Sequence, residues 1–224
     1  MIFMINPNSK LPVHQTLKWI VDYVKLLMNK TKSNGAILDD YLPLSAFPNI
    51  HNNLLLSYEL LTFYHASLIN IKKRKLLRAN DLDRIEAILT MVFIDSFSVI
   101  EYSTKELVKE KKYKVFSKIN NQLATGKRIY FSTIMKRSKE IGLIDKRQQD
   151  LLYHIRMFRN AKVHNAGIFD RAGKFEFTLY NQPFTIEYGE GKQALGPLIF
   201  PIQMVDLLTE IYLNWVKNFL KIKE

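Results

Sequence analysis

The chain has 224 residues, of which 47% are hydrophobic and 24% are charged, a composition typical of a folded globular protein rather than a disordered one. It contains no cysteine, which excludes disulfides, thiolate metal sites and cysteine nucleophiles. The length favours a single domain over residues 1–224, and the formal net charge of +12 favours polyanionic partners.

The first half of the chain is expected to form long helices. Apolar residues at helical spacing predict a helix within residues 11–30, followed by a loop over 32–49. A strongly apolar helix is expected over 51–77 and another over 82–112, capped by Asn80 or Asp81. These two long helices are predicted to pair as an antiparallel hairpin.

No segment of this sequence predicts a membrane span. The most apolar run covers residues 85–100 and is interrupted by Asp95, whereas a spanning helix needs about 18 apolar residues. The first 24 residues also lack the charge pattern and the small-residue cleavage site of a signal peptide. The expected location is therefore the cytoplasm, without a membrane partner.

The second half is expected to contain shorter helices and one hairpin. Two helices are predicted over 113–124 and 128–142, with breaks at Gly126 and Gly142. Asp145 should cap a helix over 146–164, and alternating residues predict a β-hairpin over about 174–192 that turns around residues 181–183. An amphipathic helix over 198–222 closes an all-α antiparallel bundle, with a core over about 50–222 and a helix and loop over 1–45.

Nearly all of the excess positive charge lies in one segment. Residues 105–162 contain 16 Lys/Arg and 5 Asp/Glu, a difference of +11, so the rest of the chain contributes only +1. Nucleic acid is the commonest partner of such a concentrated basic surface, although a basic face also serves solubility. The charge alone leaves both interpretations open.

The basic segment leads into a polar group of side chains at a predicted helix end. Asn160 and His164 are four residues apart and share a helix face with Arg156, while Arg159 flanks them. A purely structural helix end would also carry basic residues in its last turn and a glycine after it, as Gly167 is here. Both a structural and a chemical role are compatible with this pattern.

The motif Arg159-Asn160-Ala161-Lys162-Val163-His164 resembles the signature of the HEPN superfamily, small α-helical bundles that include many metal-independent ribonucleases. A chain of this composition would contain this spacing with the asparagine by chance only on the order of one time in a hundred. The resemblance covers the bundle from about residue 50 onward. Some HEPN toxins have a tyrosine two residues after the histidine that an antitoxin modifies, and position 166 is alanine here.

This resemblance implies an endoribonuclease that acts as a toxin or as an antiviral or stress-defence effector. Arg159, Asn160 and His164 would be catalytic, Arg156 and Lys162 would bind the RNA backbone, and Asp95 or Glu101 would support the site. It further implies a homodimer with a composite site at the interface, with an antitoxin or regulatory protein as a further partner.

Three alternatives remain at this point. The chain is an endoribonuclease, a non-catalytic HEPN module that binds RNA, a nucleotide or a partner protein, or a helical interaction protein in which the motif is fortuitous. In the last case Arg159 should pair with a buried carboxylate and His164 should be packed away from solvent. No Cys or paired His/Glu spacing predicts a metal site, and no cofactor is expected.

Overall fold

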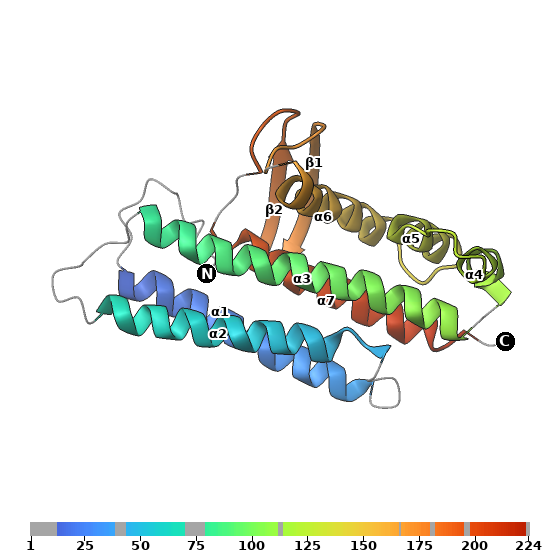
Figure 1. Cartoon of the computed structure of the whole chain (residues 1–224), viewed down its shortest axis with the longest axis horizontal. Coiled ribbons are helices and arrows are strands. Elements are labelled where there is room, and N and C mark those ends of the chain that lie inside the picture. The colour runs from blue at the N-terminus through green and yellow to red at the C-terminus, as the bar shows by residue number, and fades with distance from the viewer. Residues whose placement is uncertain are drawn as a thin grey trace. The chain divides into compact units, whose positions relative to one another are not determined.

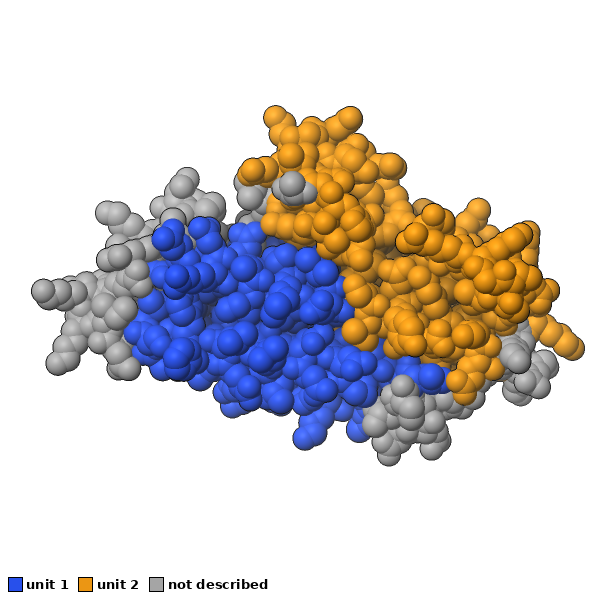
Figure 2. Space-filling model, viewed as in Figure 1, with its two compact units in different colours: residues 1–96, 195–206 blue, residues 97–194, 207–224 orange. Residues whose placement is uncertain are grey.

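The computed structural model describes residues 13–38, 44–69, 79–111, 114–165, 167–179, 182–194 and 198–222. These residues are mostly helical and carry one antiparallel hairpin (Figure 1), so the expected helical class is confirmed at this level. They form two compact units (Figure 2): unit 1 contains residues 1–96 and 195–206, and unit 2 contains residues 97–194 and 207–224. The expectation of one domain over residues 1–224 stays a prediction.

Unit 1 is built around the pair of α1 (Val13–Ile37) and α2 (Phe47–Ile69), which run side by side (Figure 1). The sequence predicted a different main pair, between α2 and α3 (Ala79–Lys111). Leu17, Ile20 and Val24 of α1 and Ile50 and Leu54 of α2 are fully buried. These apolar faces hold together two helices that follow one another in the chain.

Several helix boundaries differ from those predicted, and α2 begins at Phe47, inside the predicted loop over 32–49. α1 continues to Ile37, through the first residues of the predicted loop, because Thr31 and Asn34 are buried and extend the inward face of the helix. α3 begins at Ala79, so Asp81 lies in its first turn instead of before it and accepts a 2.6 Å hydrogen bond from the Tyr64 hydroxyl. Residues 70–77 of the predicted helix over 51–77 lie outside the described residues.

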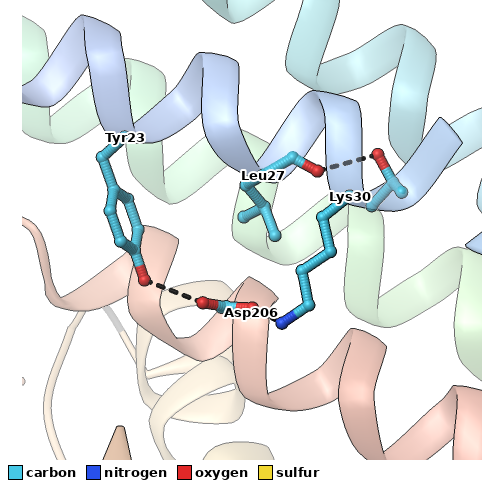
Figure 3. A network of polar contacts seen from close by, with 5 residues as sticks. Tyr23, Leu27, Lys30 and Asp206 are labelled. Carbon is cyan, nitrogen blue, oxygen red and sulfur yellow. Dashed lines mark hydrogen bonds and ion pairs between the residues drawn. The ribbon is translucent and has the colours of Figure 1, made fainter. Parts of the chain in front are cut away.

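A buried carboxylate joins α1 to the start of α7 (Phe200–Phe219) within unit 1 (Figure 3). Asp206 is fully buried, and its two oxygens accept hydrogen bonds from Tyr23 Oη at 3.0 Å and from Lys30 Nζ at 2.6 Å. A buried charge is tolerated only when it is paired and hydrogen-bonded, so Lys30 and Tyr23 stabilise the position of this helix pair.

Unit 2 contains the short helices predicted from the second half of the chain. They are a 3₁₀ turn (Lys114–Phe116), α4 (Ser117–Ala124), α5 (Phe131–Glu140) and α6 (Lys146–His164). The breaks at Gly126 and Gly142 are confirmed, and both glycines have positive φ angles, of 72° and 77°. Trp215 of α7 donates a 2.8 Å hydrogen bond to Ser138 of α5 and stacks on Phe219 in the core of this unit.

The predicted hairpin is present, with its strands at β1 (Gly173–Leu179) and β2 (Gln182–Tyr188). Its antiparallel register pairs Gly173 with Tyr188 and Leu179 with Gln182. Gln182 and Pro183, which the sequence assigned to the turn, therefore belong to β2, while Asn181 lies outside the described residues. Strand β1 packs against α6, so the hairpin covers part of the helix that carries the motif.

Candidate functional site

Local sequence signals fix both ends of α6. The Asp145 carboxylate accepts a 2.7 Å hydrogen bond from the Gln148 backbone N–H, and the Gln148 side chain accepts from the Asp145 N–H at 3.0 Å, which completes a capping box. At the other end Gly167 has a φ of 81° and donates to the Ala161 carbonyl at 2.8 Å. The predicted cap and the terminating glycine are both confirmed.

The predicted apolar face of α6 is buried. It comprises Leu151, Leu152, Ile155 and Phe158, all of them 7% exposed or less. Arg156, Asn160 and His164 follow the buried Leu152 at intervals of four residues, so they continue its stripe along α6 toward increasing exposure. Arg156 and Asn160 are half-buried, and His164 is exposed. The helix thus offers a polar strip to an incoming ligand.

The structure brings the three motif side chains into contact. Arg159 Nη1 donates a 3.1 Å hydrogen bond to Asn160 Oδ1 and a 3.2 Å hydrogen bond to His164 Nε2. Arginine has no acceptor, so in the second contact the guanidinium is the donor and His164 Nε2 the acceptor. The guanidinium, the carboxamide and the imidazole form one continuous polar group.

Arg159 lies on an aromatic ring instead of a carboxylate. Its Cζ is 5.8 Å from the centroid of the Phe97 ring, a cation–π arrangement with the part of α3 that belongs to unit 2. The Arg159 Nε atom is buried and has no hydrogen-bond partner among the described residues. Within the described part of unit 2, no carboxylate pairs with Arg159.

These features differ from those expected if the motif were fortuitous. A structural arginine at this place should pair with a buried Asp or Glu, and the histidine should be packed inside. Instead Arg159 has a buried donor without a partner among the described residues, and His164 is exposed. A buried donor without a partner costs about 1–3 kcal/mol, which a bound anion would recover. The arrangement therefore suits a site that binds an anion.

The remaining predicted residues occupy separate places. Lys162 is half-buried, with its ammonium 5.7 Å from the centroid of the Phe158 ring. The Arg156 guanidinium lies over the Tyr153 ring at 5.6 Å, and its Nε is also buried without a partner among the described residues. Glu101 forms a 2.8 Å ion pair with Lys105, and Asp95 is an exposed residue of unit 1.

A second histidine on α6 has a structural role. His154 Nδ1 is 2.9 Å from Tyr188 Oη of β2, and its ring stacks on Phe175 of β1 with 4.9 Å between centroids. Burial lowers the pKa of His154 below its ordinary value, while the nearby Asp150 acts in the opposite direction. Burial, followed by the neighbouring Tyr153, raises the pKa of Tyr188. His154 therefore fastens the hairpin to α6.

Sequence reasoning did not identify Phe97 or Tyr153 as part of this region. In the sequence, Phe97 is one of many apolar residues in a predicted core helix. Tyr153 lies among both apolar and polar residues of the predicted helix over 146–164. For Tyr153, its position three residues before Arg156 was an available signal, because such residues are neighbours on a helix surface. No comparable signal joined Phe97 to Arg159.

The described residues contain no group of three or more His, Cys, Asp or Glu side chains that could hold a metal ion. None of the helices in the described ranges is both long enough and apolar enough to cross a membrane. Comparisons of the chain with models of protein families, with curated proteins and with solved structures give no match.

Proposed function

We propose that the chain is a metal-independent endoribonuclease of the HEPN type, active in the cytoplasm as a toxin or defence effector. The observation that carries this proposal is the contact of Arg159 with both Asn160 and His164, next to solvent and without a carboxylate partner among the described residues of unit 2. The concentration of positive charge in residues 105–162 supports RNA as the substrate.

These side chains suit cleavage by transesterification. The 2′-oxygen of RNA forms a bond to the adjacent phosphorus while the bond to the 5′-oxygen breaks, leaving a 2′,3′-cyclic phosphate and a 5′-hydroxyl end. A neutral histidine accepts the proton of the 2′-hydroxyl, and a protonated histidine returns a proton to the 5′-oxygen. The Arg159 guanidinium donates hydrogen bonds to the phosphate oxygens as negative charge develops on them. Asn160 holds Arg159 in place.

A homodimer would supply the second histidine that this reaction requires. His164 is the motif's only histidine, and His154 is engaged with Tyr188 and Phe175. Two apolar residues, Val163 within the motif and Ile168 shortly after it, are 40% and 41% exposed. Their burial against a second copy would bring two motifs into one cleft, with two histidines for the two proton transfers.

The deciding experiment incubates purified protein with single-stranded RNA in excess EDTA and identifies the ends of the products. We expect cleavage with cyclic phosphate ends, lost in His164→Ala and retained in the control Asn121→Ala, a change at an exposed residue of α4. Cleavage that persists in His164→Ala, or that EDTA abolishes in the wild-type protein, would contradict the proposal.

The dimer can be tested separately through Val163. We expect Val163→Glu to yield a monomer in sedimentation analysis that still binds RNA but no longer cleaves it. A monomeric wild-type protein that cleaves at full rate would show that one motif suffices. An exposed change on α4, Asn121→Glu, lowers the net charge by one unit, as Val163→Glu does, and serves as the control.

The single histidine also favours a second candidate, a non-catalytic HEPN module that binds RNA, a nucleotide or a partner protein through the same surface. Such a module needs the Arg159 and Arg156 donors but no acid–base pair. It would bind RNA with an affinity that falls as salt rises, and it would show no turnover under any condition. The end-product assay separates this candidate from the ribonuclease.

A further inference from the structure

We propose that a small pocket between α5 and α6 binds one unstacked nucleobase of a single-stranded RNA whose backbone lies along the polar strip of α6. The proposal deepens the proposed function, because it takes RNA as the ligand, but it does not depend on cleavage. It assigns a role to the side chains of unit 2 that surround Arg156.

The pocket has the size of one base. Its volume is about 260 Å³, just below the range of about 300–1,000 Å³ that holds drug-sized molecules, so it suits a smaller ligand. The side chains of Phe131, Met135 and Leu152 line it, and each of these residues is only 5% exposed. An apolar floor of this kind suits the flat face of an aromatic ring, and a hydrated lysine or phosphate would be disfavoured there.

Polar groups at the rim can recognise the edge of a base. Gln149 is half-buried and lines the pocket, and its carboxamide offers a donor and an acceptor on one plane. Ser132, on the α5 side, adds a hydroxyl that can donate or accept. Lys146 and Asp150 also line the rim but pair with each other at 2.6 Å. Gln149 is therefore the residue placed to select the base.

Arg156 and Tyr153 provide the feature that favours RNA over an apolar ligand. The Arg156 guanidinium lies over the Tyr153 ring, both residues line the pocket, and the buried Arg156 Nε has no partner among the described residues. Unstacked RNA bases bind on aromatic rings and on guanidinium planes. A base oxygen at this place would satisfy the unpaired N–H.

Helix geometry relates the pocket to the motif. Arg156 precedes Asn160 by four residues and His164 by eight, so it lies about 6 Å and about 12 Å from them along the axis of α6. A strand that presents its scissile phosphate to Arg159 and His164 would then place a nucleotide on one side of that bond next to the pocket. The site would make cleavage depend on the identity of that nucleotide.

The test measures equilibrium binding in the full chain carrying His164→Ala, so that RNA is bound but not cut. A set of short fluorescently labelled single-stranded RNAs would each carry one abasic nucleotide at a different position. We expect one position at which loss of the base weakens binding about 10-fold, within the range of base stacking on aromatic side chains.

Pocket variants then connect that position to the pocket. Gln149→Leu and Tyr153→Leu should remove most of the difference between intact and abasic RNA, whereas Gln122→Leu, in a separate pocket formed with α4, should preserve it. Gln149 and Tyr153 are half-buried and exposed, so thermal melts should show all three variants folded.

Each outcome decides a different claim. RNA binding that is indifferent to abasic substitution at every position, or a full abasic effect that persists in both pocket variants, would refute the base pocket and leave the ribonuclease proposal intact. A protein that binds no RNA would refute both. A position-specific abasic effect that only the pocket variants abolish would support the pocket whether or not the wild-type protein cleaves.

Discussion

Arg159 Nη1 lies 3.2 Å from Nε2 of His164, five residues further along α6. Five residues on an ideal helix are separated by about 140° around the axis and about 7.5 Å along it, so backbone geometry alone does not bring the two side chains together. The long arginine side chain spans this separation, and Asn160 accepts from the same Nη1. The contact thus pre-assembles a cationic donor and a histidine before any ligand binds.

Replacing Arg159 by lysine should distinguish the contribution of the planar guanidinium geometry from that of the positive charge. Lysine keeps the positive charge but loses the planar fork that can donate two parallel hydrogen bonds to a phosphate. If the chain cleaves RNA, we expect Arg159→Lys to lower kcat by about 10²- to 10³-fold, the range seen when one transition-state donor is removed. Single-turnover RNA cleavage would measure this.

The matched control for this prediction is Arg128→Lys, an exposed arginine of unit 2 outside the motif. It should leave kcat within about 2-fold of the wild-type value, because lysine keeps the positive charge and position 128 is outside the motif. Equal effects of the two substitutions would mean that Arg159 contributes only general positive charge.

How much of this site could be predicted from the sequence depends on how local the signals are. Asp145 with Gln148 three residues later, and Gly167 after the last turn, specify the ends of α6 through nearest-neighbour hydrogen bonds. The position of Arg159 on Phe97 depends instead on the packing of a helix more than 60 positions earlier in the chain. No local pattern encodes that contact.

The fold shows the same division. Gly35 and the residues around it suggested a loop, since a glycine inside a helix costs about 1 kcal/mol. Leu27, Thr31, Asn34 and Leu38 nevertheless continue one buried face at helical spacing, and Thr31 Oγ1 donates to the Leu27 carbonyl at 3.0 Å. Burial of that face outweighs the low helix propensity of Gly35. The prediction of a loop around Gly35 was wrong because it gave priority to the glycine.

The stability of the protein should depend on pH through His154. Burial lowers the folded-state pKa of this residue below its unfolded value of 6.5, so the unfolded chain binds more protons between those two values. The contribution to stability is therefore fully present above about pH 6.5 and is lost as pH falls through the folded pKa. We expect the free energy of unfolding to decrease more steeply between pH 7 and pH 5 in the wild-type protein than in His154→Phe.

Urea denaturation at several pH values would measure the two slopes. The comparison cancels the other histidines and the carboxylates, which both proteins share, and phenylalanine keeps an aromatic ring against Phe175. Parallel curves for the two proteins would show that His154 is not linked to folding. A steeper decrease in His154→Phe would reverse the sign of the predicted linkage.

Removing the charge of Lys30 should lower the free energy of unfolding, because the buried Asp206 carboxylate loses its cationic partner. Lys30→Met keeps the length of the side chain but leaves the Asp206 carboxylate without its ammonium partner at 2.6 Å. Complete loss of a partner from a buried pair costs about 3–5 kcal/mol, and because the Lys30 side chain is 29% exposed, water will reduce this cost. We expect unfolding free energy to fall by about 2 kcal/mol.

The control is Lys32→Met, a change at an exposed position of the same helix, which should alter stability by no more than about 0.5 kcal/mol. Adding Asp206→Asn to Lys30→Met should restore part of the loss, since the neutral amide no longer needs a cation while Tyr23 can still donate to its oxygen. A Lys30→Met protein as stable as the wild type would show that Tyr23 and other contacts suffice.

The capping box of α6 should stabilise the helix that carries the motif. Asp145→Ala removes the acceptor for the Gln148 backbone N–H, and loss of such a cap costs about 1 kcal/mol. Asp150→Ala removes one partner of an ion pair between side chains that are 70% and 51% exposed, which should cost less than about 0.5 kcal/mol. Urea denaturation should therefore rank Asp145→Ala as the more destabilising change.

Hydrogen exchange should quicken first at the amides of residues 147–149, because the first turn loses its acceptor while Gly167 still ends the helix. Faster exchange at residues 159–164 instead would mean that the motif end of α6 depends on the distant cap, contrary to the local role assigned to it.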